Sequence, residues 1–95
     1  MSQPESRLSR KIAKALRYEK GAFVFKVHGS VHMTAGLPDL IVCHRGIFYG
    51  LEVKMPESRD DVSVRQQFVH QQIIKARGNV AVVCSVEEAL DVLPS

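Results

Sequence analysis

Apolar residues recur along this chain at two different spacings, one that is typical of helices and one that is typical of strands. A helix is expected over residues 3–20, where apolar positions share one side of a helical wheel: Leu8, Ile12, Ala15 and Leu16. Alternating apolar positions predict strands over residues 22–28, 38–43 and 47–54. The first half of the chain is therefore expected to form one helix followed by three strands.

The second half returns to helical spacing. Ser63 opens a second helix, with Gln66 at the spacing of a capping box, and Gly78 is expected to cap its end. Residues 79–85 predict a buried strand, and residues 86–92 a short last helix. A helix between the last two strands permits a crossover connection, so the pattern predicts an α/β fold in which helices flank a mixed central sheet.

The two middle strands are expected to form a hairpin that turns at His44-Arg45-Gly46. If Arg45 and Gly46 form a two-residue loop, Asp39 lies directly across from Glu52, with Cβ atoms about 4.5–5.5 Å apart. A three-residue loop with a bulge at Gly46 would shift this register by one residue.

Two facing carboxylates destabilise a sheet unless a cation compensates them. Oxygen ligands of this kind suit a hard divalent ion, so we expect Asp39 and Glu52 to bind Mg²⁺ or Mn²⁺. Lys54 follows Glu52 by two residues and leaves the same face of the strand. The end of the hairpin is thus expected to combine a metal site with a nearby ammonium group.

Several segments around these residues, in the same order, resemble one nuclease family. They are Phe25-Lys26-Val27-His28-Gly29, Gly36-Leu37-Pro38-Asp39-Leu40, Leu51-Glu52-Val53-Lys54, and a Gln67 that precedes Gly78 by eleven residues. Together they resemble the VRR-NUC branch of the PD-(D/E)XK nuclease superfamily, over nearly the whole chain. The resemblance implies a restriction-endonuclease-like αβββαβ core and a metal-dependent DNA endonuclease.

The resemblance also implies roles for individual residues. Asp39 and Glu52 would hold the metal, with the Val53 carbonyl as a further ligand, and Lys54 would orient the attacking water or stabilise the developing charge. Glu5 and Gln67 would position the waters of the metal and the DNA backbone. Glu5 also stands at capping-box spacing from Ser2, so a purely structural role at the start of the first helix stays open for it. Gln66 already has a capping role, which leaves Gln67 as the free amide, and the choice of Gln67 depends mainly on the resemblance.

Cations on the first helix offer a second functional surface. The side opposite the apolar stripe carries Arg7, Arg10, Lys11, Lys14 and Arg17. Such a face is either a solvated surface or a phosphate contact, and the net charge of +3 permits both. Lys26 is the better phosphate contact on its strand. His32 lies in the loop before Asp39, where it either contacts DNA or is exposed without a role.

Length and composition fit one globular domain over residues 1–95. No apolar run approaches the roughly 18–20 residues that span a bilayer, and the N-terminus lacks the apolar core of a signal peptide, so a cytoplasmic location is expected. The sequence leaves open whether the chain is bacterial or phage-encoded. Cys43 and Cys84 fall in apolar strands and are expected to be buried, reduced thiols.

Six aromatic residues and no Trp argue against a surface that stacks single-stranded bases, so we expect recognition of DNA shape. Stand-alone relatives implied by the resemblance resolve four-way (Holliday) junctions as homodimers, and a two-fold dimer matches a two-fold junction. Three alternatives stay open: a DNA-binding module that no longer cuts, a structural protein, and a restriction, nicking or flap nuclease.

Overall fold

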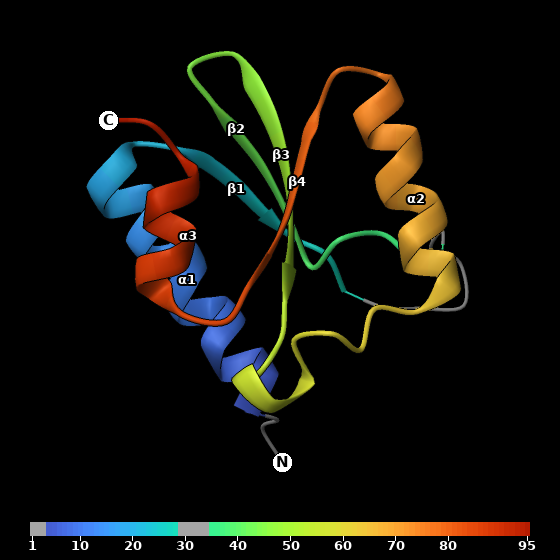
Figure 1. Cartoon of the computed structure of the whole chain (residues 1–95). Coiled ribbons are helices and arrows are strands. Elements are labelled where there is room, and N and C mark those ends of the chain that lie inside the picture. Colours follow the sequence, from blue (N-terminus) through green and yellow to red (C-terminus); the bar gives the residue numbers. More distant parts are fainter. Residues whose placement is uncertain (1–3, 29–34) are drawn as a thin grey trace.

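The computed structural model describes residues 4–28 and 35–95 of the chain (Figure 1). Their elements follow the expected order: α1 (Pro4–Lys20), β1 (Phe23–Lys26), β2 (Leu40–His44), β3 (Ile47–Val53), the 3-10 helix η1 (Pro56–Ser58), α2 (Val64–Lys75), β4 (Asn79–Val83) and α3 (Val86–Val92). None of the described helices is long and apolar enough to cross a membrane.

The sheet has the order β1-β2-β3-β4. The first three strands are antiparallel, whereas β3 and β4 are parallel and are joined by α2 as a crossover. α1 and α3 lie together on one face of the sheet, and α2 lies on the other (Figure 1). The predicted α/β fold with a mixed sheet between helices is therefore confirmed.

A two-residue turn sets the register of the β2–β3 hairpin. Arg45 and Gly46 both have positive φ, 55° and 78°, as the tight turns of hairpins require. Leu40 consequently pairs with Leu51 at the far end of the ladder. The expected register is confirmed, and the alternative with a bulge at Gly46 is excluded.

The main core lies between the sheet and the α1–α3 layer. Ile12 and Leu16 of α1 are fully buried there against Leu40, Leu51 and Leu93. Burial of each such side chain contributes about 1.5–3 kcal/mol. The predicted stripe on α1 is correct for Ile12 and Leu16, and Leu8 is partly buried against the same core. The buried small residues of α1 are Ser9 and Ala13 rather than Ala15.

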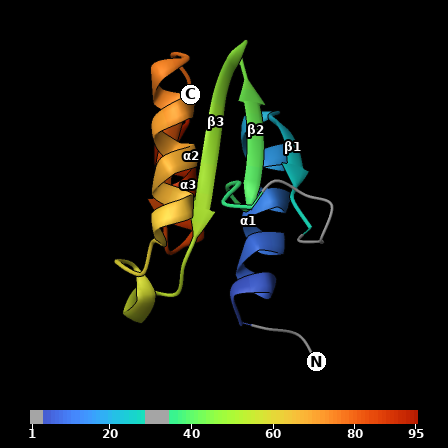
Figure 2. The ribbon, with the colours of Figure 1, turned by 90° about the vertical axis from the view of Figure 1, so that its right-hand side faces the viewer.

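α2 covers only part of the other face. It packs on β4, and Figure 2 shows β2 and β1 to one side of it, with no helix of the described residues in front of them. Cys43 lies on this side, and its side chain is exposed, whereas Cys84 is buried. The expectation of a buried Cys43 is wrong because the face of β2 that carries it has no covering layer.

The aromatic residues are distributed in an unexpected way. All six lie in the described part of the chain, and only Tyr49 is buried. The exposed ones are Tyr18, Phe23, Phe25, Phe48 and Phe68. Five of the six aromatic side chains are therefore exposed. The small number of aromatic residues is thus not sufficient to argue against an exposed aromatic surface, as was inferred from the composition.

The end of α2 differs by one residue from expectation. Arg77, not Gly78, adopts the left-handed conformation, with φ of 75°. The Gly78 amide donates to the Ile73 carbonyl and the Arg77 amide to the Ile74 carbonyl, which is the Schellman arrangement. Gly78 is needed for space instead, because a Cβ there would lie 2.8 Å from Cγ2 of Ile73 and 3.0 Å from Cδ1 of Phe48.

Candidate active site

The hairpin brings Asp39 and Glu52 to the same end of the sheet, on the face that carries α2. Oδ2 of Asp39 accepts a hydrogen bond of 2.8 Å from the backbone amide of Val53, the residue after Glu52. The Asp39 carbonyl accepts another from the Val27 amide, beyond the end of β1. Backbone contacts from both neighbouring strands therefore fix Asp39 beside Glu52.

Glu52 is fully buried, and α2 supplies a partner for each of its carboxylate oxygens. Nε2 of Gln66 donates to Oε1 over 3.0 Å, and Nε2 of His70 lies 2.8 Å from Oε2. Gln66 and His70 are four residues apart, one helical turn, so both face the sheet. The crossover helix thus holds the orientation of the Glu52 carboxylate.

Electrostatics favour a proton at this position. Burial of Glu52, the negative charge of Asp39 and a hydrogen bond with Asp39 together raise the pKa of Glu52 to about 8, although Lys54 opposes the shift. Burial and the charge of Lys54 lower the pKa of His70. We therefore describe Glu52 and His70 as a neutral hydrogen-bonded pair at neutral pH rather than as an ion pair, because burial disfavours both charges.

The donors at this site fit a magnesium-like ion. Within residues 4–28 and 35–95, no three His, Cys, Asp or Glu side chains gather as a metal-binding group. A site here would consist of two carboxylates completed by water and backbone oxygen, and Mg²⁺ commonly binds one or two carboxylates while keeping several waters. The raised pKa of Glu52 supports this fit, because a cation replacing the proton would relieve the repulsion from Asp39.

Glu5 and Lys54 complete the charged surroundings. The charge of Glu5 raises the pKa of Glu52 and that of Lys54 lowers it, so both side chains act on the same carboxylate. Glu5 is half-buried in the first turn of α1, and Lys54 directly follows β3. The sequence-predicted group of Asp39, Glu52, Lys54 and Glu5 is therefore close enough to interact electrostatically.

Gln67 does not belong to this group. Its side-chain amide donates to the Val62 carbonyl over 2.9 Å, and the residue is exposed. Gln66 does form the predicted capping box with Ser63 through its oxygen, Oε1. Its nitrogen stays available and donates to Glu52, so a capping role did not exclude Gln66 from the site.

His70 was missed in the sequence because nothing marks it locally as more than a helical histidine. The signal that the sequence offers is spacing, because His70 lies one helical turn after Gln66 and therefore on the same side of the helix. Recognition of that side depends on knowing that Gln66, and not Gln67, faces β3.

The predicted cations of α1 are exposed: Arg7, Arg10, Lys11 and Lys14. Arg7 and Lys11 line a groove of about 490 Å³ with Met55 and Pro56, which directly follow Lys54. The basic side of α1 therefore continues to the end of the sheet that carries the acids. Arg17 is committed elsewhere, because it donates to the Val24 carbonyl over 2.9 Å.

Lys26 and His32 have different outcomes. Lys26 is half-buried at the end of β1 and pairs in register with Leu40, one residue from Asp39. His32 lies outside the described residues, so its predicted DNA contact stays a prediction.

Comparison with known proteins supports the same family. No family model matches the chain, and no curated protein does. A solved structure described as "VRR_NUC domain" superposes with a TM-score of 0.72 and 28% sequence identity, over 96% of this chain and 95% of that one. The chain is thus similar to a VRR_NUC domain along almost its whole length, in agreement with the resemblance of its motifs.

Proposed function

We propose that this chain is a divalent-metal-dependent nuclease that hydrolyses DNA phosphodiester bonds. The observation that carries the proposal is the pair of Asp39 and Glu52, two neighbouring carboxylates of which one is buried with a pKa of about 8. The similarity to a VRR_NUC domain supports it, as does the resemblance of the sequence motifs to those of PD-(D/E)XK enzymes.

The chain's own residues would divide the work. Asp39 and Glu52, with the Val53 carbonyl, would hold Mg²⁺ or Mn²⁺, which supplies polarisation of the phosphate and activation of water. Lys54 would stabilise charge that develops on the phosphate. Gln66 and His70 would keep Glu52 in its ligating orientation, since they contact its two oxygens. Glu5 would position water near the metal from α1.

DNA would approach along α1. Several of its cations are exposed, and two of them, Arg7 and Lys11, line the groove with Met55 and Pro56, which directly follow Lys54 at the end of the sheet. Lys26 lies near Asp39 at the end of β1. Phosphate contacts of this kind position DNA without reading its sequence. We propose selection of branched DNA, including four-way junctions, by a homodimer, because two-fold symmetry would present two matched sites to a junction.

A substrate panel tests the proposal. Linear, nicked, flap and four-way DNA would be incubated with wild type, Asp39→Ala and Lys54→Ala in Mg²⁺ or Mn²⁺, with Asp61→Ala as a control acid that is exposed after η1. We expect cleavage by wild type and the control, and activity reduced by about a thousandfold or more in the other two. Equal cutting by all four proteins would refute the site.

A non-cutting DNA-binding module is the second candidate, since exposed cations alone would serve it. It predicts junction binding that weakens with salt and no cleavage in either metal. The simultaneous presence of Asp39, Glu52 and Lys54 favours the enzyme.

A further inference from the structure

An aromatic surface lies on the part of the sheet that α2 leaves uncovered. Phe23 and Phe25 are two residues apart on β1 and share one face, with 64% and 51% of their surfaces exposed. Phe23 pairs with Cys43, and Cys43 pairs with Phe48, so one row crosses three strands. We name Phe23, Phe25, Ile41, Cys43 and Phe48 the open sheet face.

This face is unusual for so small a domain. The core of a 95-residue chain is limited, and yet three of its four Phe side chains lie on the open sheet face, outside the core. Contiguous exposed apolar patches on soluble proteins commonly mark binding sites. The placement of these Phe residues therefore needs a ligand that tolerates or uses flat rings.

Charge identifies the class of ligand. β1, β2, the hairpin turn and α2 with the residues up to Gly78 contain no Asp or Glu, and the acid of β3, Glu52, is buried under α2 at the other end of the face. Lys26 alternates with Phe25 and leaves β1 on the opposite face. The other fully charged residues of these elements are all cations: Arg45, Arg65, Lys75 and Arg77. Exposed aromatic rings with cations around them, and acids only at one end, are a combination that binds single-stranded nucleic acid by stacking bases and neutralising phosphates. A second copy of the chain would bring the same positive charge against itself.

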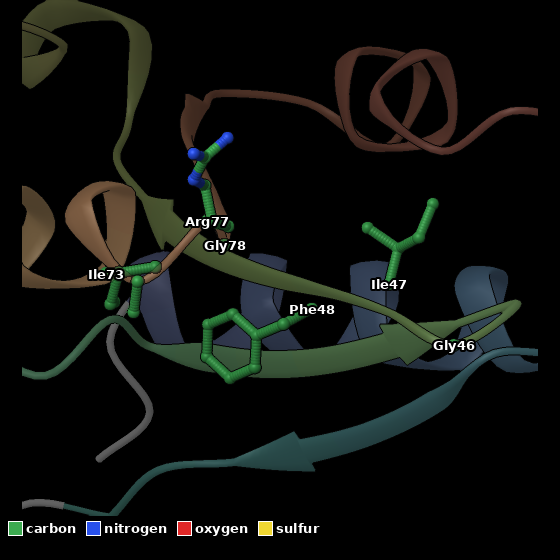
Figure 3. Close-up of a pocket in the computed structure, with 7 residues that line it drawn as sticks. Gly46, Ile47, Phe48, Ile73, Arg77 and Gly78 are labelled. Carbon is green, nitrogen blue, oxygen red and sulfur yellow. The ribbon is translucent and has the colours of Figure 1, made fainter.

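The far end of this face has a groove of a size suited to a small ligand. Phe48 and Ile73 flank Gly78 there, and with Ile47 and Arg77 they line a space of about 450 Å³ (Figure 3). Figure 3 shows Phe48 and Ile73 on the same side of this space and Arg77 directed away from them at its rim. An apolar floor with a guanidinium at the edge suits a base and its phosphate.

The acids lie at the opposite end of the same face. β1 runs from Phe23 toward Val27, whose amide contacts the Asp39 carbonyl. A strand lying over the open sheet face would therefore lead to Asp39 and Glu52. We propose that the open sheet face binds an unpaired DNA strand by stacking bases on Phe23 and Phe25, and that, among branched substrates, those with a single-stranded segment beside the cleavage point, such as flaps, are cut in preference to fully paired ones. The second part of this inference rests on the proposed nuclease function.

Binding without cleavage tests the first part independently of catalysis. The probe is a labelled single-stranded DNA of about 12 nucleotides, within the range of known single-strand sites, titrated in EDTA and followed by fluorescence anisotropy. We expect the double variant Phe23→Leu/Phe25→Leu to bind about 10- to 100-fold more weakly than wild type, and Phe23→Tyr/Phe25→Tyr to bind as wild type does. Leu keeps an apolar side chain but removes the ring, so the comparison isolates stacking.

A matched control and a second probe complete the design. Phe68→Leu is the matched control, because the Phe68 ring is as exposed as the ring of Phe23. Phe68 lies two positions after Gln66 and therefore on the opposite side of α2. This variant should bind the strand as wild type does. An abasic strand of the same length should bind wild type as weakly as the intact strand binds the double Leu variant. Thermal melting of each variant confirms folding.

Two outcomes would overturn the inference. Full binding by the double Leu variant would show that rings are not used. Sedimentation of wild type as a dimer that the double Leu substitution dissociates, with unchanged DNA binding, would assign the open sheet face to a second copy. The two proposals can fail separately. If wild type does not bind by stacking but cleaves duplex substrates, only the binding inference fails. If wild type binds by stacking but shows no metal-dependent cleavage, only the nuclease proposal fails.

Discussion

Nε2 of His70 lies 2.8 Å from Oε2 of Glu52, in a part of the site where both residues are buried. Gln66 contacts the other oxygen of the same carboxylate. Gln66, fourteen positions after Glu52 in the chain, thus helps to fix the orientation of the Glu52 side chain. Substitutions on the side of α2 that faces Glu52 should therefore affect the site, and those on its other sides should not.

Neighbouring glutamines offer a direct test of this arrangement. Gln66→Ala removes the hydrogen bond to Glu52, so we expect metal affinity and cleavage to fall about 10- to 100-fold, as for other residues that orient metal ligands. Gln67→Ala removes only a contact with the Val62 carbonyl and should leave both unchanged. Calorimetric titration with Mn²⁺ measures the affinity separately from activity.

Ser63→Ala is the control for the lost capping box. The substitution should cost about 1 kcal/mol of unfolding free energy, because the Ser63 hydroxyl accepts a hydrogen bond from the backbone N–H of Gln66. It leaves the hydrogen bond from the Gln66 side chain to Glu52 in place. If Ser63→Ala reduced metal affinity as strongly as Gln66→Ala does, the effect would belong to the helix end and not to the hydrogen bond with Glu52.

Stability of the metal-free protein should depend on the proton of Glu52. The pKa is about 8 in the folded chain and near 4.5 when unfolded, so the folded state holds more protons between these values. The contribution of this group to the unfolding free energy is therefore fully present below about pH 4.5, and it is lost as pH rises from there through 8. The expected loss is about 3–5 kcal/mol.

Glu52→Gln removes this titration and keeps the shape of the side chain. We expect the variant to be more stable than wild type in EDTA at about pH 9 and to differ much less at about pH 5, as measured by urea unfolding, while cleavage is lost. A wild-type advantage at the higher pH would contradict the proposed repulsion between Asp39 and Glu52.

Metal binding should release a proton near neutral pH. A cation held by Asp39 and Glu52 competes with the proton that Glu52 carries below about pH 8, so affinity for Mn²⁺ should increase between about pH 6 and 8. Calorimetric heats measured at neutral pH in two buffers of different ionisation enthalpy should differ accordingly. Identical heats in both buffers would indicate that Glu52 is already ionised.

Local rules were sufficient for the hairpin but not for the helix that faces it. The Arg45-Gly46 turn fixed the pairing of Leu40 with Leu51, and hence the approach of Asp39 to Glu52, because a two-residue loop admits one register. The choice between Gln66 and Gln67 depended on how α2 is rotated over the sheet. An amide has both an acceptor and a donor, so the capping role of Gln66 and its contact with Glu52 were compatible.

Exposure of the aromatic residues was equally beyond local rules. Alternation over β1 predicts that Phe23 and Phe25 share a face, but it does not say whether a layer covers that face. Coverage is decided by where α2 lies, and α2 packs over β4. The same reason explains the exposed thiol of Cys43.

Gly36 connects the motif before Asp39 with the start of α2. Its φ is 90°, and a Cβ there would lie 2.6 Å from the Arg65 carbonyl oxygen, so Gly36→Ala would strain the backbone and separate the two segments. We expect a loss of about 2–4 kcal/mol in unfolding free energy. Gly46→Ala is the matched control: its φ is also positive, at 78°, but no atom lies within 4 Å, so it should cost only about 1 kcal/mol. Urea unfolding of both variants measures the difference, and similar losses would mean that backbone conformation alone, and not the approach to Arg65, requires glycine at position 36.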